Sequence, residues 1–340
     1  MKQRARRLSN VLIAMTAGFM VAPLSAQVSP PETQRISFQI ATGPVSGTYM
    51  RVGEVVARII SNPPGLARCE VDGVCGPEGL IATTRSSSGS IANARSVNAG
   101  RVKSALVQGD VLAAAREGTG PFKDVGPQSA LRAIARLQDE TLHLVVAPRS
   151  RIKKLADLAG KRVAIDADRS ALNFTVRELL EAGGIGLGRI KVSLLAADKA
   201  AEAMRNGKLD AFFAIGVPPI KSVDTLVRRE QGRVIAIDAR ALSALQKKNP
   251  LLAKTVIASD TYRSSKAVAT LNVASVWVVH ASLSDDIVYD ILRSLWNPAN
   301  RAELKRLGPV ATTIEPARAG ENLPVPLHEG AQRFYAEAGR

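Results

Sequence analysis

Apolar positions recur along this chain with two alternating periods. Between residues 36 and 41 every second residue is apolar, and between 49 and 61 apolar residues are three or four apart. The first period is typical of a strand and the second of a helix. The same succession predicts further strands at 80–85, 104–108, 130–137, 141–147, 163–166, 190–195, 211–215, 234–237 and 274–279. It predicts further helices at 91–98, 154–158, 172–182, 197–206 and 285–295, and a short final helix within 323–339.

This alternation of strands and helices predicts an α/β fold with mostly parallel sheets. The order of the elements indicates two lobes. The first would be built from residues 27–147 plus 255–340, and the second from residues 148–254. The chain would then pass between the lobes twice, so two crossing strands would form a hinge.

The N-terminus has the three parts of a secretory signal peptide. Four basic residues and no acid precede an apolar stretch at 11–24, and small residues follow up to Ala26. A basic start, a short apolar region and a small-residue cleavage site mark a segment that is removed on export. We therefore expect residues 1–26 to be cleaved and the mature chain to work outside the cytoplasm. The alternative is an uncleaved anchor, which the interrupted apolar stretch fits poorly because a span needs about 20 sustained apolar residues.

Composition excludes some classes of function. Hydrophobic residues make up 46% and charged residues 22% of the chain, close to ordinary globular values. The formal charge of +16 falls to +12 if Lys2, Arg4, Arg6 and Arg7 leave with the signal peptide. The remaining basic residues are scattered and aromatic residues are only 4%, so few rings could stack on bases. Nucleic acid is therefore not an expected partner, and the charge indicates either a preference for small anions or a soluble surface.

The two cysteines, Cys69 and Cys75, are predicted to form a disulfide. An Asp-Gly pair lies between them, which favours a turn, and export would place them in an oxidising compartment. The alternative, a metal site, needs further ligands. The histidines at 143, 280 and 328 are far apart and lack metal-ligand spacing. We expect neither a metal nor a cofactor.

Two loops of small residues occupy equivalent positions in the first lobe. Residues 42–48 and 86–90 each follow a strand and precede a helix, and Gln108 ends the next strand. Glycine allows close backbone approach to a ligand, and a helix N-terminus presents free N–H groups that suit an anion. Ligands of open α/β sheets bind at this end of the strands. The alternative for either loop is plain helix capping.

The second lobe offers a similar turn at 166–173. Arg169 could bind a carboxylate through two parallel hydrogen bonds, or it could be an exposed arginine paired with Asp166 or Asp168. The ring of Phe213 could line a cleft or belong to the core. His143 lies inside an apolar strand and is interpreted as a core histidine. No nucleophile elbow, zinc-protease motif or phosphate-binding loop occurs in the sequence, so we do not expect an enzyme.

The same segments resemble the TAXI family (TRAP-associated extracytoplasmic immunogenic proteins). The likeness spans nearly the whole mature chain, and five motifs in order carry it. They are Thr-Gly-Pro-Val-Ser-Gly-Thr-Tyr at 42–49, Ser-Gly-Ser-Ile-Ala-Asn at 88–93 with Ala-Leu-Val-Gln-Gly-Asp-Val at 105–111, the block 154–165, Leu-Asp-Ala-Phe-Phe at 209–213, and the block 324–331.

The resemblance implies a two-lobe periplasmic-binding-protein fold of type II-like architecture. It also implies a monomeric periplasmic receptor that closes its hinge around a small organic acid or amino acid, either a dicarboxylate or a glutamate-like solute. The receptor would deliver the solute to a TRAP-type membrane permease. Together, the loops and the resemblance give a set of candidate ligand-binding residues: Thr42, Gly43, Ser46, Gly47, Thr48, Tyr49, Ser88, Gly89, Ser90, Gln108, Asp168, Arg169, Ser170, Asn173 and Phe213.

One loop departs from the family pattern. Where the family usually has a Gly-Ser-Gly-Thr-like turn, this chain has Asp168-Arg169-Ser170-Ala171, which replaces close backbone approach by charged side chains. Two alternatives to the permease receptor remain. The chain could serve an ABC importer or a sensor kinase, or it could be a periplasmic lyase or dehydratase on the same scaffold. The enzyme would need a cleft carboxylate with a raised pKa, for which Asp166 and Asp168 are the candidates.

Overall fold

A computed structural model describes residues 35–45, 47–263 and 266–339. These residues fall within one compact unit, residues 34–340, and the predicted signal peptide at 1–26 lies outside them. They form a ten-stranded sheet with the order β2-β1-β3-β10-β4-β7-β5-β6, in which β8 also pairs with β4 and β9 with β10. The strands are β1 (Ile36–Ala41), β2 (Leu80–Arg85), β3 (Ser104–Gln108), β4 (Leu131–Val146), β5 (Arg162–Ala164), β6 (Lys191–Ser193), β7 (Ala211–Gly216), β8 (Arg233–Ile235), β9 (Leu252–Ile257) and β10 (Val268–His280).

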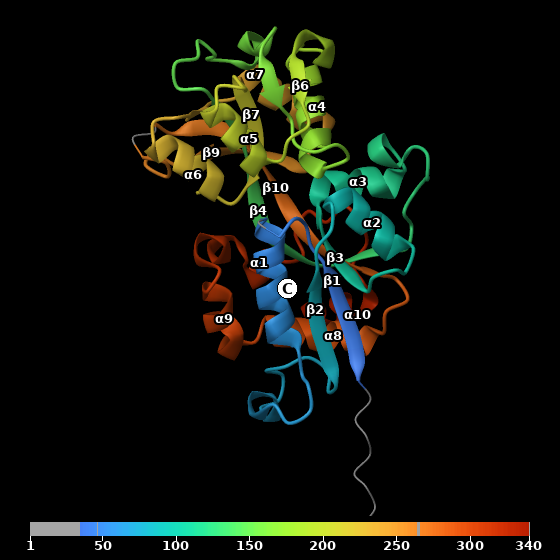
Figure 1. The fold of residues 1–340 in the computed structure, drawn as a ribbon. Coiled ribbons are helices and arrows are strands. Elements are labelled where there is room, and N and C mark those ends of the chain that lie inside the picture. The colour runs from blue at the N-terminus through green and yellow to red at the C-terminus, as the bar shows by residue number, and fades with distance from the viewer. Residues whose placement is uncertain (1–34, 46, 264–265, 340) are drawn as a thin grey trace, which may run out of the picture. The chain divides into compact units, whose positions relative to one another are not determined.

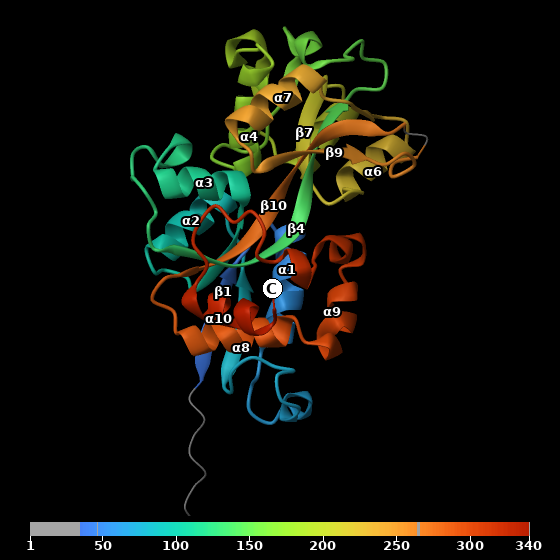
Figure 2. The same cartoon turned by 180° about the vertical axis from the view of Figure 1, so that it is seen from behind.

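Helices cover both faces of this sheet (Figures 1 and 2). They are α1 (Thr48–Ile60), α2 (Ser90–Asn98), α3 (Gly109–Glu117), α4 (Ala171–Ala182), α5 (Ala197–Arg205), α6 (Lys221–Arg228), α7 (Ala239–Lys248), α8 (Asp285–Leu295), α9 (Arg301–Lys305) and α10 (Glu329–Glu337). None of the helices in the part of the chain described by the structure has the length and apolarity that crossing a bilayer requires.

The sheet continues through two lobes, and β4 and β10 run from one lobe into the other (Figures 1 and 2). In the first lobe β1 pairs in parallel with β2 and β3, and in the second β5 pairs in parallel with β6 and β7. The crossing strands pair antiparallel with each other and with the strands beside them. The predicted α/β fold with two crossing hinge strands is therefore confirmed. The predicted lobe boundaries stay a prediction, and β9 pairs along its whole length with β10.

Strand alternation divides the apolar residues of the first lobe into two layers. Trp277 and Val279 of β10 pack with α1 and α8, whereas Val276 and Val278 pack with α2 and α3. Successive side chains of a strand point to opposite faces, so a single strand supplies both layers. The second lobe likewise has one core under α4 and α7 and another under α5 and α6.

The centre of β4 differs from the sequence-based expectation. Two separate strands at 130–137 and 141–147 were expected, because Gln138, Asp139 and Glu140 interrupt the apolar pattern. The structure has one strand throughout, and these three polar residues are buried. The backbone groups of Asp139 and Glu140 join the ladder with β10, and Gln138 lies at a register shift of that ladder, so polar side chains are tolerated where the strand crosses between the lobes. β10 is longer than the predicted 274–279 for the same reason, because polar residues lie at its centre.

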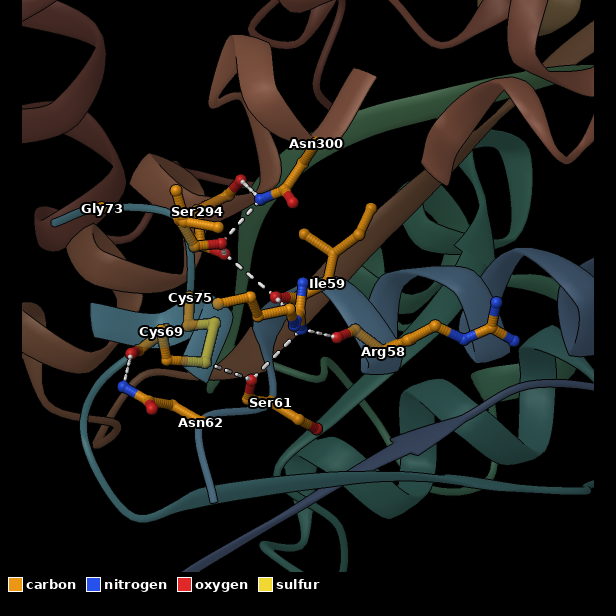
Figure 3. Close-up of a disulfide and its surroundings, with 12 residues drawn as sticks. Arg58, Ile59, Ser61, Asn62, Cys69, Gly73, Cys75, Ser294 and Asn300 are labelled. Atoms are coloured by element: carbon orange, nitrogen blue, oxygen red, sulfur yellow. Dashed lines mark hydrogen bonds between the residues drawn. A yellow bond between two sulfur atoms is a disulfide. The ribbon is translucent and has the colours of Figure 1, made fainter. Parts of the chain in front are cut away.

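The predicted disulfide between Cys69 and Cys75 is confirmed (Figure 3). It closes an excursion between α1 and β2 that hydrogen-bonds to the C-terminal end of α1. Arg68 donates to the carbonyl oxygens of Arg58 and Ile59, and Gly76 N–H donates to the Ile60 carbonyl over 3.1 Å. The last carbonyl groups of a helix have no partner within the helix, so the excursion supplies the donors that they need.

Candidate functional site

Three helices of the first lobe begin at one edge of the sheet. α1, α2 and α3 follow β1, β2 and β3, and their first residues are Thr48, Ser90 and Gly109. Gly89, immediately before α2, has a φ of 100°, a conformation that glycine adopts without strain. The small-residue loops expected from the sequence therefore lie at the carboxyl ends of neighbouring parallel strands, where their helices present free N–H groups.

A group of buried polar side chains lies where this edge meets the crossing strands. We call it the polar cluster, and its members come from α1, α2, β3, α3, β4 and β10: Tyr49, Ser90, Gln108, Asp110, Glu140 and Ser275. The Gln108 N–H donates to Ser90 Oγ over 3.0 Å, and its side-chain Nε2 donates to Glu140 Oε2 over 3.1 Å. Ser275 is the direct neighbour of Gln108 in the pairing of β10 with β3. Segments far apart in the sequence thus supply one site.

Burial shifts the protonation equilibria of this cluster. It raises the pKa of Glu140 to about 7, although hydrogen bonds from Gln108 and Tyr49 oppose the shift. Burial also raises the pKa of Asp110 to about 6, against the opposing hydrogen bond from Thr175. The phenol pKa of Tyr49 is raised well above its usual range by burial and then by Glu140. Among the described residues, neither carboxyl group forms an ion pair with a lysine or arginine; the nearby Arg136 pairs with Asp139 instead.

Several polar atoms of this region have no hydrogen-bond partner among the described residues. They include Gln108 Oε1, Ser275 Oγ and both amide atoms of Gln138. Gln108 is 3% exposed, and Gln138 and Ser275 are 0% exposed. Leaving a buried polar group unpaired costs about 1–3 kcal/mol, so native proteins avoid it except where a ligand, water or functional role explains it. These atoms mark the polar cluster as a place that can receive a polar partner.

The second lobe contacts the cluster through the start of α4. Thr175 Oγ donates to Asp110 Oδ2 over 2.6 Å, and each of the two residues is only 1% exposed. On the other side, Thr48 Oγ lies 3.4 Å from the position that a Cβ on Gly216 would occupy. In the first contact, α4 of the second lobe meets the N-terminal end of α3 in the first lobe. In the second contact, the C-terminal end of β7 meets the N-terminal end of α1.

The remaining predicted residues of the first lobe have mainly local contacts. Thr42 is buried, and its hydroxyl donates to the Arg85 carbonyl over 3.0 Å, which joins its loop to β2. Gly43 and Gly47 lie in the same loop, where the Gly47 N–H closes a turn onto Pro44. Ser46 lies outside the described residues. The predicted site residues that the structure gathers in the polar cluster are therefore Tyr49, Ser90 and Gln108.

The predicted loop of the second lobe has two kinds of residue. Ser170 caps α4 by accepting from the Asn173 N–H, and Asn173 Oδ1 accepts from Arg177 over 2.6 Å. Asp168 and Arg169 are exposed and form no ion pair within the described residues. Burial raises the pKa of the neighbouring Asp166.

Phe213, the aromatic candidate of the second lobe, and His143, expected to be a core residue, both lie in the core of that lobe. Phe213 is fully buried and packs in the same apolar cluster as α4 and α7. His143 is also fully buried, as the sequence indicated. Its Nδ1 donates to the Thr141 carbonyl over 2.9 Å, and its Nε2 pairs with the Tyr262 hydroxyl at the same distance.

Two cavities of about 270 Å³ each lie outside the polar cluster. One adjoins the opposite side of the crossing strands, between Asp139, Asn272, Thr255 and Thr313. The other lies beside α2 and is lined by Ser88, Arg85 and Arg101 among others. The cavities and the unpaired buried polar atoms thus indicate different candidate binding sites. The cluster is the better candidate for a specific site, because its unpaired buried atoms need a partner whereas exposed cavity walls are solvated.

Sequence reasoning missed two acids and two hydroxyl residues at and beside the polar cluster. Glu140, Asp110, Ser275 and Thr175 received no role, although Asp110 lies inside one of the motifs quoted above. The sequence contains a pattern from which the role of Glu140 could have been predicted. Three consecutive polar residues between two apolar strand patterns indicate either a loop or a strand whose polar residues meet a site, and the short length of the gap favours the second.

Comparison with known proteins gives a family and a fold. A sequence model of the NMT1-like family matches residues 40–339. A structure of a protein from Bordetella bronchiseptica RB50 is similar at 16% identity, over 91% of this chain and 100% of that one, with a TM-score of 0.50. A Xanthomonas citri protein bound to ATP matches at 13% identity, over 88% and 98%, with a TM-score of 0.50. The alkanesulfonate-binding protein SsuA from Xanthomonas axonopodis pv. citri, bound to MOPS, matches at 14% identity over 88% and 83%, with a TM-score of 0.45.

At these identities the structural likeness concerns the fold, which is the α/β periplasmic-binding-protein fold expected from the sequence. The family match corrects one expectation. The assignment to the TAXI family is wrong, because the matching family is the NMT1-like family, and the TRAP-type permease expected as a partner is withdrawn with it.

Proposed function

The chain belongs to the NMT1-like family, and on that premise we propose that it is a periplasmic solute-binding protein. It binds a small polar solute at the polar cluster and delivers it to a membrane importer. The observation that carries this proposal is the set of buried polar atoms without partners, within the described residues, at the carboxyl ends of β1, β2 and β3. Ligands of open α/β sheets bind at this edge.

Binding would act through the hinge formed by β4 and β10. A solute that contacts both lobes favours the closed arrangement over the open one by its difference in affinity for the two. The contact between Thr175 and Asp110 supports this mechanism, since it joins buried groups of the two lobes beside the cluster. Arg169 and the helix N-termini remain candidates for binding a carboxylate of the solute.

For the membrane partner we favour an ABC importer, which the sequence left as an alternative. This choice rests on the family, and a sensor kinase is its rival. ATPase activity of the importer in proteoliposomes should rise when the solute-loaded protein is added on the receptor side. N-terminal sequencing of the exported protein tests the predicted cleavage, and we expect it to start at Gln27.

A thermal-shift screen tests solute binding itself. Residues 27–340 would be heated with organic acids, amino acids and sulfonates. A solute at 100 times its dissociation constant stabilises the native state by about 2.7 kcal/mol through mass action. We expect a small group of related solutes to raise the melting temperature. If no member of the panel does so, a receptor for small polar solutes is contradicted.

One observation favours a second candidate, a lyase or dehydratase. Glu140 and Asp110 are buried carboxyl groups whose pKa values are raised to about 7 and about 6, as general acid–base catalysis requires. NMR spectra of a solute from the screen, followed in the presence of the protein, decide between the two. A receptor leaves the solute unchanged, whereas an enzyme converts it.

A further inference from the structure

The polar cluster is rich in hydrogen-bond acceptors and contains two acidic groups. Glu140 and Asp110 are 5% and 1% exposed, and their side-chain donors are all neutral: Gln108 and Tyr49 for Glu140, and Thr175 for Asp110. Within the described residues, neither forms an ion pair with lysine or arginine. An isolated buried carboxylate is costly, so proteins keep such groups paired with a cation or protonated. The cluster therefore lacks the positive charge that its acids call for.

The acceptor atoms beside Glu140 are also unused. Gln108 Oε1 belongs to the same amide that donates to Glu140, and it has no donor of its own among the described residues. Ser275 Oγ, on the neighbouring strand directly opposite Gln108, likewise has no donor there, and the Tyr49 hydroxyl lies beside it. A carboxylate oxygen, an amide oxygen and a hydroxyl thus lie together at the junction of β3, β4 and β10.

We propose that the solute carries a protonated amine and that Glu140 binds it. This inference rests on the proposed receptor function and names the chemical class of its solute. A primary ammonium group has three N–H donors and no acceptor, which matches the carboxylate, the amide oxygen and the hydroxyl at this junction. Its charge also supplies the missing partner of Glu140. A solute with only carboxylate or sulfonate groups would add a third anion beside Glu140 and Asp110, so the same geometry disfavours it.

An amino acid satisfies both ends of the predicted site. Its ammonium group would meet Glu140, while its carboxylate would face the N-termini of α1 and α2, where free N–H groups favour negative charge. A dicarboxylate could use only the second half of this arrangement. The proposal thus separates two classes of solute that the sequence left together.

Matched pairs of probes test the inference by isothermal titration calorimetry. Each pair consists of an amino acid and the acid that lacks its amino group: L-alanine with propionate, L-leucine with 4-methylpentanoate, and L-glutamate with glutarate. We expect the amino acid of at least one pair to bind the wild-type protein at least tenfold more tightly than its partner. In Glu140→Gln, which keeps the size and one acceptor oxygen but removes the charge, that advantage should fall to less than threefold.

Glu117→Gln is the matched control. Glu117 is an exposed residue at the end of α3, so its substitution removes the same charge from the surface and should leave the amino-group advantage unchanged. Deamino acids that bind as tightly as the amino acids would overturn the inference and leave the receptor function standing. An amino-group advantage that persists in Glu140→Gln would also overturn the inference and leave the receptor function standing. If none of the six probes binds, the inference is refuted, and only the wider solute screen then decides on the receptor function.

Discussion

Replacing Glu140 by glutamine should stabilise the solute-free protein at alkaline pH. The pKa of this carboxyl group rises from its ordinary 4.5 to about 7 because the folded protein buries it. Each pKa unit corresponds to about 1.4 kcal/mol, so the charged form costs the folded state about 3 kcal/mol. Because the pKa is raised on folding, this cost is absent well below pH 4.5, grows as pH rises towards 7 and is complete above it. Glutamine carries no charge and avoids the cost.

Urea denaturation of wild type and Glu140→Gln at pH 5 and pH 8 measures this effect. We expect the variant to gain about 2–3 kcal/mol over wild type between the two pH values, which is roughly 5 °C in melting temperature for a unit of this size. Glu117→Gln should show no such gain, because its carboxyl group is exposed. A Glu140→Gln protein that is no more stable than wild type at pH 8 would refute the conclusion that Glu140 is a desolvated, uncompensated acid.

A stabilising substitution that weakens solute binding would identify the residue as one retained for function. Binding sites often sacrifice stability in this way, since groups that await a ligand are left unpaired in its absence. The same variant therefore has two expected effects of opposite kind: higher stability without solute, and loss of the amino-group advantage with it. A residue with a purely structural role would lower both.

Three further predictions concern other parts of the chain. Burial lowers the pKa of His143 to about 4, so an NMR titration should show its ring neutral down to about pH 5. The unfolded chain binds a proton at this residue more readily, so stability should fall by about 3 kcal/mol as pH drops from 6.5 to 4. A titration midpoint near 6.5 would contradict the burial of His143. Replacing Cys69 and Cys75 by alanine should lower the free energy of unfolding in urea by about 2 kcal/mol, the chain-entropy value for a short loop, and an unchanged value would show that the disulfide contributes nothing. Arg169→Ala should weaken solute binding at least tenfold in calorimetry if Arg169 binds a carboxylate, a loss of about 1.4 kcal/mol; an unchanged affinity would remove Arg169 from the site.

Local signals in the sequence were sufficient for much of the fold. The starts of α1 and α2 at Thr48 and Ser90 follow small-residue loops and regular apolar spacing, and both were predicted to within a residue. The disulfide was predictable because six positions and a turn separate Cys69 from Cys75. In each case the information lies within a few residues of the feature itself.

The acids of the polar cluster could not be assigned in the same way. Glu140 is buried because β4 crosses between the lobes, and Asp110 because α4 of the other lobe covers it through Thr175. Both depend on contacts between residues distant in the sequence. The prediction of an anionic solute, made from the net charge and the helix N-termini, likewise did not take these two carboxyl groups into account. Of the two solute classes expected from the sequence, these carboxyl groups favour the amino acid over the dicarboxylate.

Hydrogen–deuterium exchange with the tightest solute of the screen tests most directly where this protein binds. Binding at the polar cluster should slow amide exchange in 104–110 of the first lobe and in 171–176 of the second, because the solute would hold β3, α3 and α4 together. Protection confined to 255–258 and 309–313 would place the solute in the cavity beside Asp139 instead. Protection confined to 85–88 and 101–102 would place it in the cavity beside α2, and either result would contradict the site described above.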